Sequence, residues 1–174
     1  DTTVEMGTWH PGPGIVIAAN TTNPEVWDAP ARKKLFTIDR HDRPLAGTAI
    51  SPDGKNLVVV LGAAPAADDE ANEYSDEEPG TGTRFETWSI STGRMIEDLR
   101  VDREGVTAVG MSKDGSHVYV GWNDGTVDVL ETATMGSLRT IGVHPAEITG
   151  FEVSPDGALL AATDADGATT IWRP

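Results

Sequence analysis

The segment Ser51-Pro52-Asp53-Gly54 recurs further along the chain as Ser112-Lys113-Asp114-Gly115 and as Ser154-Pro155-Asp156-Gly157. Each copy ends in an Asp-Gly pair, which favours a tight turn because glycine adopts positive φ without a steric penalty. Each turn separates two short runs of alternating apolar residues, at 45–50 and 56–61, 106–111 and 117–122, and 148–153 and 158–163. The pattern therefore predicts a strand–turn–strand unit three times over.

The spacing of these units is regular. A large apolar residue in a third predicted strand follows each turn, and these residues are Trp88, Leu130 and Trp172. In the last two units it lies 16 positions after the turn aspartate, and the next turn aspartate lies 26 positions after Trp88 and after Leu130. The sequence therefore repeats every 42 residues.

A degenerate copy of the repeat opens the chain, with a Pro- and Gly-rich turn at 10–14 and Trp27 followed by Asp28. A fourth predicted strand ends each of the first three units, at 34–38, 95–101 and 137–141. Four short antiparallel strands per repeat of about 40–45 residues are typical of a β-propeller blade. We predict an all-β chain of about 15 strands, with Trp27, Trp88, Leu130 and Trp172 in equivalent places.

The predicted domain organisation is one partial β-propeller over residues 1–174. Its blades are expected at about 1–43, 44–104, 105–147 and 148–174, and the last of them lacks an outer strand. An open set of four blades leaves sheet faces and a strand edge exposed. We therefore expect the chain to be part of a larger ring, whose other blades come from the same or another chain, rather than a self-closed ring of four.

These features together resemble the WD-repeat β-propellers, named for their tryptophan–aspartate pair. The resemblance rests on the Ser-Pro-Asp-Gly turns, on Trp27-Asp28, on the 42-residue period, and on His41 and His144, each 12 residues before a turn aspartate. The run Val118-Tyr119-Val120 is also similar to the YVTN-type repeats of bacterial propellers. Both resemblances imply the same fold, but they differ in the expected location and partners, and the compartment stays open.

The WD-repeat resemblance implies a structural hydrogen-bond tetrad in the last unit. Its members are His144, Thr163, Asp166 and Trp172. The third unit has Asp102, Gly121, Asp124 and Leu130 at the matching positions, which cannot form the same network. The same His, Thr and Asp can be drawn as a catalytic triad, but nucleophilic catalysis needs an exposed and activated hydroxyl. We expect the structural role, no catalytic residue and no cofactor.

One interval breaks the repeat, because 35 rather than 16 positions separate Asp53 from Trp88. The 19 extra residues fall within 62–82, and the stretch 68–78 contains seven acids and no base. The residues predicted to contact a partner there are Asp68, Asp69, Glu70, Glu73, Tyr74, Asp76, Glu77 and Glu78. The resemblance places this loop on the partner-binding face. Three interpretations of the loop stay open: it binds a basic protein segment, it weakly binds a cation, or it is only a solvated loop without a ligand.

Two further observations concern sites. Trp122 ends a predicted strand near the same face, so it is either a contact residue for a partner or part of the packing between blades. The turn aspartates carry one carboxylate per turn, whereas calcium needs several oxygens from one short loop. We therefore predict a turn role for them, and no metal site.

Composition narrows the function. The chain has 28 acidic and 13 basic residues, a formal net charge of −15 and no cysteine. The negative charge disfavours nucleic-acid binding, and no apolar run reaches the length that crosses a membrane. We favour a non-catalytic protein-interaction scaffold. The alternative is part of an extracytoplasmic propeller enzyme or redox subunit, similar to a lactonase or a dehydrogenase.

Overall fold

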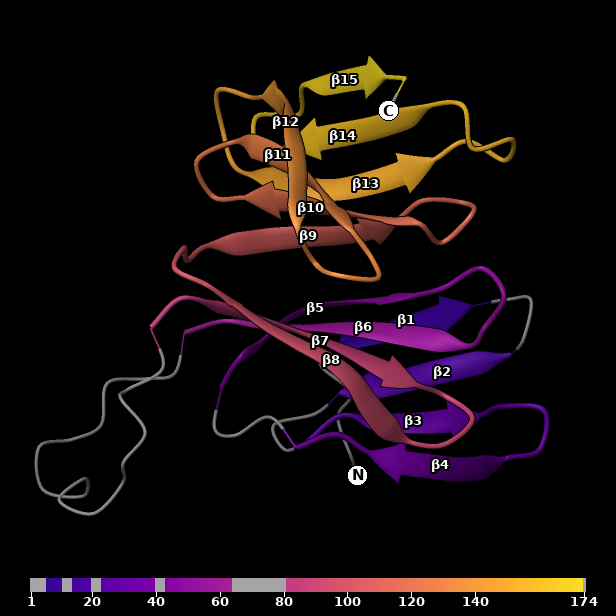
Figure 1. Cartoon of the computed structure of the whole chain (residues 1–174). Coiled ribbons are helices and arrows are strands. Elements are labelled where there is room, and N and C mark those ends of the chain that lie inside the picture. Colours follow the sequence, from indigo (N-terminus) through magenta and orange to yellow (C-terminus); the bar gives the residue numbers. More distant parts are fainter. Residues whose placement is uncertain (1–5, 11–13, 20–22, 40–42, 64–80, 174) are drawn as a thin grey trace, which may run out of the picture.

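The structure, a computed structural model, describes residues 6–10, 14–19, 23–39, 43–63 and 81–173. Within these ranges the chain forms fifteen β-strands and no helix. The strands make four antiparallel sheets, and each sheet contains strands that are consecutive in the sequence (Figure 1). The prediction of an all-β fold is therefore confirmed.

Each sheet follows the same up-and-down order. The strands of the first two sheets are β1 (Met6–His10), β2 (Ile15–Ala19), β3 (Glu25–Asp28) and β4 (Lys33–Thr37), then β5 (Leu45–Ile50), β6 (Asn56–Leu61), β7 (Thr83–Ser89) and β8 (Arg94–Val101). Those of the last two are β9 (Val106–Met111), β10 (His117–Trp122), β11 (Thr126–Glu131) and β12 (Ser137–Val143), then β13 (Ile148–Val153), β14 (Leu160–Asp164) and β15 (Thr169–Trp172).

The repeat predicted from the spacing is present in the strand register. Trp27, Trp88, Leu130 and Trp172 each lie in the third strand of their sheet, opposite Val16, Leu57, Val118 and Leu160 of the second strand. The second strand of the last sheet begins at Leu160, two residues later than predicted.

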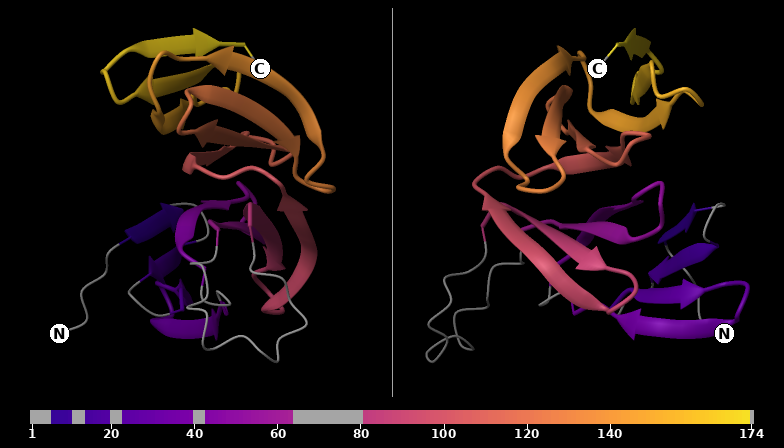
Figure 2. Two further views of the ribbon diagram at one scale, coloured as in Figure 1. Left: turned by 90° about the vertical axis from the view of Figure 1, so that its left-hand side faces the viewer. Right: turned by 45° about the vertical axis from the view of Figure 1, so that its right-hand side comes forward.

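The sheets stack in chain order, and the first strand of each contacts the first strand of the next: β1 with β5, β5 with β9, and β9 with β13. Figure 2 shows the first and last sheets at opposite ends of this stack. Neighbouring sheets that meet through their first strands are arranged as propeller blades are.

Strand β6 shows how the core forms. Its side chains alternate between two faces, as the pleat of a strand requires. Leu57, Val59 and Leu61 pack with the first sheet, whereas Val58 and Val60 pack with the third. All five are completely buried, because a sheet covers each face of the strand.

The two ends of the strands carry different loops. The Asp-Gly turns and the connections between third and fourth strands lie at one end, which we call the turn end. The connections between second and third strands lie at the other, which we call the loop end, together with the segments that join successive sheets. The insertion at 62–82 therefore emerges at the loop end.

Candidate functional site

The two ends of the insertion are tied together by Arg43. Its Nη1 donates hydrogen bonds to the carbonyl oxygens of Gly62, at 2.8 Å, and of Gly82, at 3.1 Å. Arg43 is only 4% exposed. The eight insertion residues predicted to contact a partner, Asp68, Asp69, Glu70, Glu73, Tyr74, Asp76, Glu77 and Glu78, lie outside the described residues. The structure therefore shows where the insertion leaves the sheet, and at that place the buried, positively charged side chain of Arg43 joins its two ends.

The second end of the insertion is also attached to the segment that leads into the third sheet. Gly82 has φ +78°, and a Cβ there would lie 2.3 Å from the carbonyl oxygen of Val101, so only glycine fits without strain. Its N–H donates to Glu104 Oε1 at 3.3 Å, and Thr83 Oγ1 donates to the carbonyl of Arg103 at 2.6 Å. The second end of the insertion is therefore hydrogen-bonded to the segment between β8 and β9, which leads into the third sheet.

Trp122 lies beside this base, but its side chain is covered. The Arg103 guanidinium carbon lies 4.0 Å from the centroid of the Trp122 ring, and Trp122 is only 2% exposed. The indole N–H donates to Asp128 Oδ2 at 2.9 Å, and Arg103 Nη1 donates to the same oxygen at 2.9 Å. Of the two roles considered for Trp122, the described geometry is that of packing rather than of a surface contact, because Arg103 occupies the outer face of the ring.

Asp128 is the centre of this cluster. Its Oδ1 accepts a hydrogen bond from Thr140 at 2.6 Å, while Arg103 also pairs with Asp124 at 2.8 Å. The sequence excluded only the tetrad from the third sheet, and this different network was not predicted. A signal was available in the sequence, because Glu86 and Asp128 are acidic residues one repeat of 42 positions apart. In the structure the Glu86 carboxylate accepts a hydrogen bond from the Trp88 indole at 2.9 Å.

The last sheet contains part of the tetrad that the resemblance implied. His144 Nδ1 lies 3.0 Å from Asp164 Oδ2, and its ring meets that of Trp172 edge-on at 5.5 Å. The carboxylate at His144 is that of Asp164, and not that of Asp166, which is exposed and uses its backbone N–H to bond Asp164 Oδ1. Thr163 is exposed as well, and its hydroxyl oxygen accepts a hydrogen bond from Thr149 Oγ1 at 3.4 Å.

Asp164 meets His144 because of the turn that follows β14. Its Oδ1 accepts the N–H groups of Asp166, at 3.1 Å, and of Ala168, at 2.8 Å, so the other oxygen is left for the imidazole. The hydrogen bond from His144 is the largest of the effects that lower the pKa of Asp164. The His144 and Asp164 side chains are 2% and 0% exposed, so neither is accessible to a substrate.

The turn aspartates have the predicted turn role. Asp53 Oδ1 accepts hydrogen bonds from Ser51 Oγ at 2.7 Å and from the Lys55 N–H at 3.1 Å. The bond from Ser51 is the main cause, and those from Lys55 the next, of the lowered pKa of Asp53, which is about 2. Asp114 and Asp156 make the same hydrogen bonds with Ser112 and Ser154, and their pKa values are also lowered. Because each carboxylate is used within its own turn, it fixes the hairpin.

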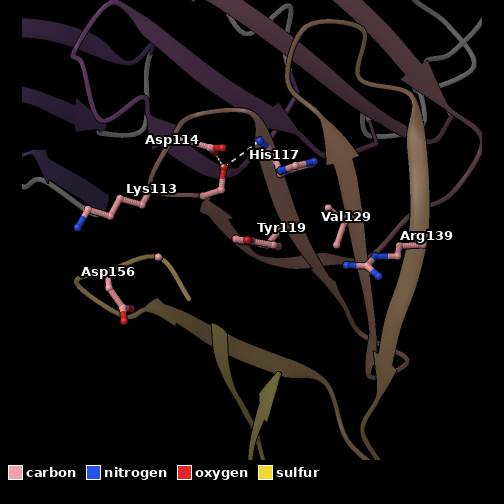
Figure 3. Close-up of a pocket in the computed structure, with 9 residues that line it drawn as sticks. Lys113, Asp114, His117, Tyr119, Val129, Arg139 and Asp156 are labelled. Atoms are coloured by element: carbon pink, nitrogen blue, oxygen red, sulfur yellow. Dashed lines mark hydrogen bonds between the residues drawn. The ribbon is translucent and has the colours of Figure 1, made fainter. Parts of the chain in front are cut away.

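A pocket of about 420 Å³ opens at the turn end between the third and fourth sheets. Figure 3 shows Asp114 and His117 on one side, Arg139 on the opposite wall, and Tyr119 and Val129 between them. Lys113 and Asp156 complete its charged rim. Burial is the main cause of the raised pKa of Tyr119, so its hydroxyl stays protonated and neutral. The pocket combines an apolar floor with charges of both signs.

No group of three or more His, Cys, Asp or Glu side chains in the described ranges is placed to hold a metal ion. No helix in those ranges is long and apolar enough to cross a membrane.

Comparison with known proteins identifies one repeat directly. The family model described as "WD domain, G-beta repeat" matches residues 135–173, which include His144, Asp164 and Trp172. That range contains the whole of β12, β13, β14 and β15.

Several curated proteins are similar to larger parts of the chain. Autophagy-related protein 16 of Arabidopsis thaliana is 22% identical over 97% of this chain and 38% of its own length. Guanine nucleotide-binding protein subunit beta-5b of Danio rerio is 25% identical over 53% of this chain and 26% of its own length. Actin-interacting protein 1 of Caenorhabditis elegans is 45% identical over 33% of this chain and 10% of its own length.

The chain thus spans less than two fifths of the length of these relatives. The similarity to YVTN-type repeats has no counterpart among these matches. The matched repeat, the similarity to WD-repeat proteins and the four stacked antiparallel sheets together support a WD-repeat domain of the β-propeller fold.

Proposed function

We propose that this chain is a non-catalytic protein-interaction scaffold, and that it presents the insertion at 62–82 to a basic segment of a partner protein. The observation that carries the proposal is the attachment of both ends of the insertion to the buried Arg43, at 2.8 and 3.1 Å. A long loop anchored at its base on a rigid sheet is a common way to position binding residues.

The charge of the chain suits this function. The stretch 68–78 has seven acids and no base, and the whole chain has a net charge of −15. A concentrated negative charge accelerates the encounter with a basic partner, and the effect weakens as salt screens it. The names of two relatives agree with a role in protein assemblies, since one is an actin-interacting protein and another is a G-protein subunit.

The described side chains also argue against catalysis at the one triad that the sequence suggested. His144 and Asp164 are buried, and Thr163 hydrogen-bonds to Thr149 rather than to His144. A nucleophile needs its base within hydrogen-bond reach. No observation among the described residues favours the lactonase-like or dehydrogenase-like alternative.

The test uses a fluorescent peptide of alternating lysine and glycine as the probe, with binding measured by anisotropy at low and high salt. In one variant, Glu73→Gln, Asp76→Asn and Glu77→Gln remove three charges from the insertion. The matched control, Glu147→Gln, Glu152→Gln and Asp166→Asn, removes three exposed charges elsewhere. We expect the first variant to weaken binding at least about threefold at low salt and the control to weaken it less, because the effective charges are those near the bound peptide.

A second variant replaces residues 63–81 with Asn-Gly, a pair that suits a two-residue hairpin. Arg43 holds Gly62 and Gly82 close together, so β6 and β7 should keep their register and the free energy of unfolding should stay nearly unchanged. Loss of folding would show that the insertion is structural. Equal binding by the two charge variants would contradict the proposed site.

A further inference from the structure

We propose that a second pocket, between the second and third sheets at the turn end, binds a lysine side chain of a partner protein. The pocket has a volume of about 390 Å³. It goes beyond the proposed function, since the insertion emerges at the opposite end of the strands. We call it the acidic pocket.

The acidic pocket has two walls from different sheets. Thr87 of β7, with Ile96 and Glu97 of β8, forms the wall from the second sheet. The wall from the third sheet is formed by the turn after β9 and by the segment 131–133, which begins at the last residue of β11. The site therefore exists only because the two sheets are stacked.

The charge of this pocket has one sign. Glu97 and Glu131 line it, both are exposed, and none of its lining residues is Lys, Arg or His. Glu131 is held in place, because its Oε2 accepts a hydrogen bond from Thr134 Oγ1 at 2.9 Å. Two carboxylates without a cation in the lining favour a positively charged ligand.

Two threonines give the second, independent observation. Thr87 and Thr132 line the same pocket and are 4% and 7% exposed, and both hydroxyl oxygens are buried without a hydrogen-bond partner among the described residues. Buried polar groups almost always have a partner, and leaving one unpaired is unfavourable. Rotation between staggered χ1 positions turns a threonine hydroxyl from one side to another, and the proposal requires such a rotation to direct each oxygen toward the ligand.

A lysine ammonium matches these groups. It has three hydrogen-bond donors and no acceptor. Two hydroxyls and one carboxylate supply three acceptors, and Ile96, which is 52% exposed, offers apolar surface to the methylene stem. Lysine is favoured over arginine because a compact ammonium can bond to three separate acceptors in one pocket, whereas a planar guanidinium pairs best with one carboxylate.

The pocket of Figure 3, between the third and fourth sheets, is the repeat equivalent of the acidic pocket and serves as an internal control. In the second sheet, Thr87 lies opposite Val58 and Glu97. In the third sheet, Val129 lies opposite Tyr119 and Arg139. A methyl and a guanidinium thus replace the hydroxyl and the carboxylate, so the fold does not require the polar groups of the acidic pocket.

The experiment is an NMR titration of the isotope-labelled 174-residue chain with Nα-acetyl-lysine methylamide. Nα-acetyl-norleucine methylamide, which lacks the ammonium, and Nα-acetyl-arginine methylamide are parallel probes. We expect saturable shifts at Thr87, Ile96 and Thr132 with the lysine probe only. Glu97→Gln and Thr87→Val should each weaken binding about tenfold, the size expected for losing a hydrogen bond to a charged group. Arg139→Gln should leave it unchanged.

Stability separates a binding role from a structural one. Replacing an unpaired buried hydroxyl by a methyl group removes an unfavourable burial, so Thr87→Val and Thr132→Val should keep or raise the Tm. A lowered Tm would show that the hydroxyl has a structural partner and would overturn the proposal. Equal shifts with norleucine, equal or tighter binding of arginine, or no shift with any probe would overturn it too. The variant without residues 63–81 should still bind the lysine probe.

Discussion

The imidazole of His144 shows how a single residue connects elements of this fold. It lies between the carboxylate of Asp164, at 3.0 Å, and the ring of Trp172, at 5.5 Å between centroids. Asp164 in turn accepts two backbone N–H groups of the turn that leads into β15. The His144 imidazole therefore joins the segment before β13 to the last hairpin.

Removing either member of this pair should lower stability. We expect His144→Ala and Asp164→Asn each to lower the free energy of unfolding by about 1–3 kcal/mol, because each leaves a buried polar partner without its hydrogen bond. Asp166→Asn is the matched control and should change it by less than about 0.5 kcal/mol, since its side chain is exposed. Urea denaturation measures all three. A loss with Asp166→Asn as large as that with Asp164→Asn would restore Asp166 as the partner of His144.

At the scale of strands, neighbouring sheets approach each other closely at two glycines. A Cβ added at Gly47 of β5 would lie 2.6 Å from Val109 Cγ2 of β9, and one added at Gly121 of β10 would lie 2.6 Å from Ile148 of β13. Both contacts join one sheet to the next. Glycine is needed here for close packing between sheets, since neither position requires positive φ.

Gly47→Ala should therefore lower the free energy of unfolding by about 1–3 kcal/mol, the usual cost of overpacking a core. Gly150→Ala is the control, because Gly150 occupies the same repeat position but its added Cβ would have Thr163 Oγ1, at 3.7 Å, as its nearest neighbour. Thermal unfolding followed by circular dichroism compares the two variants. Equal effects would mean that the sheets are not packed at Gly47 as described.

At the scale of the molecule, the sheets form a linear stack in which stability depends on neighbours. Strand β6 has a sheet on each face, and its residues 57–61 are completely buried. Strand β15 is the edge of its sheet, and its residues 169–171 are exposed. In a repeat architecture, local stability is the sum of each unit and its contacts with adjacent units.

Hydrogen exchange should show this gradient. Amides of β6 should exchange only through global unfolding, whereas those of β15 should exchange faster through local opening, because few buried contacts hold that strand. Mass spectrometry of peptic fragments at neutral pH measures both. Equal protection of β6 and β15 would show that the four sheets unfold as one cooperative unit.

Local patterns in the sequence determined the units of the fold. Asp-Gly turns, alternating apolar residues and the 42-residue interval predicted the strands, their order within each sheet and the equivalence of Trp27, Trp88, Leu130 and Trp172. These features were predictable because turn geometry and strand pleat depend on residues that are adjacent in the chain.

Contacts between distant segments were decided only by the tertiary structure. Asp164 and Asp166 are two positions apart, and the folded turn alone determines which of them meets His144. Trp122 is buried because it packs in the core between the second and third sheets and because Arg103, from the segment before β9, lies over its ring. The acidic pocket forms where two sheets meet. Side-chain neighbours of this kind depend on how whole sheets are stacked and how loops close over them, and the periodicity of a sequence specifies neither.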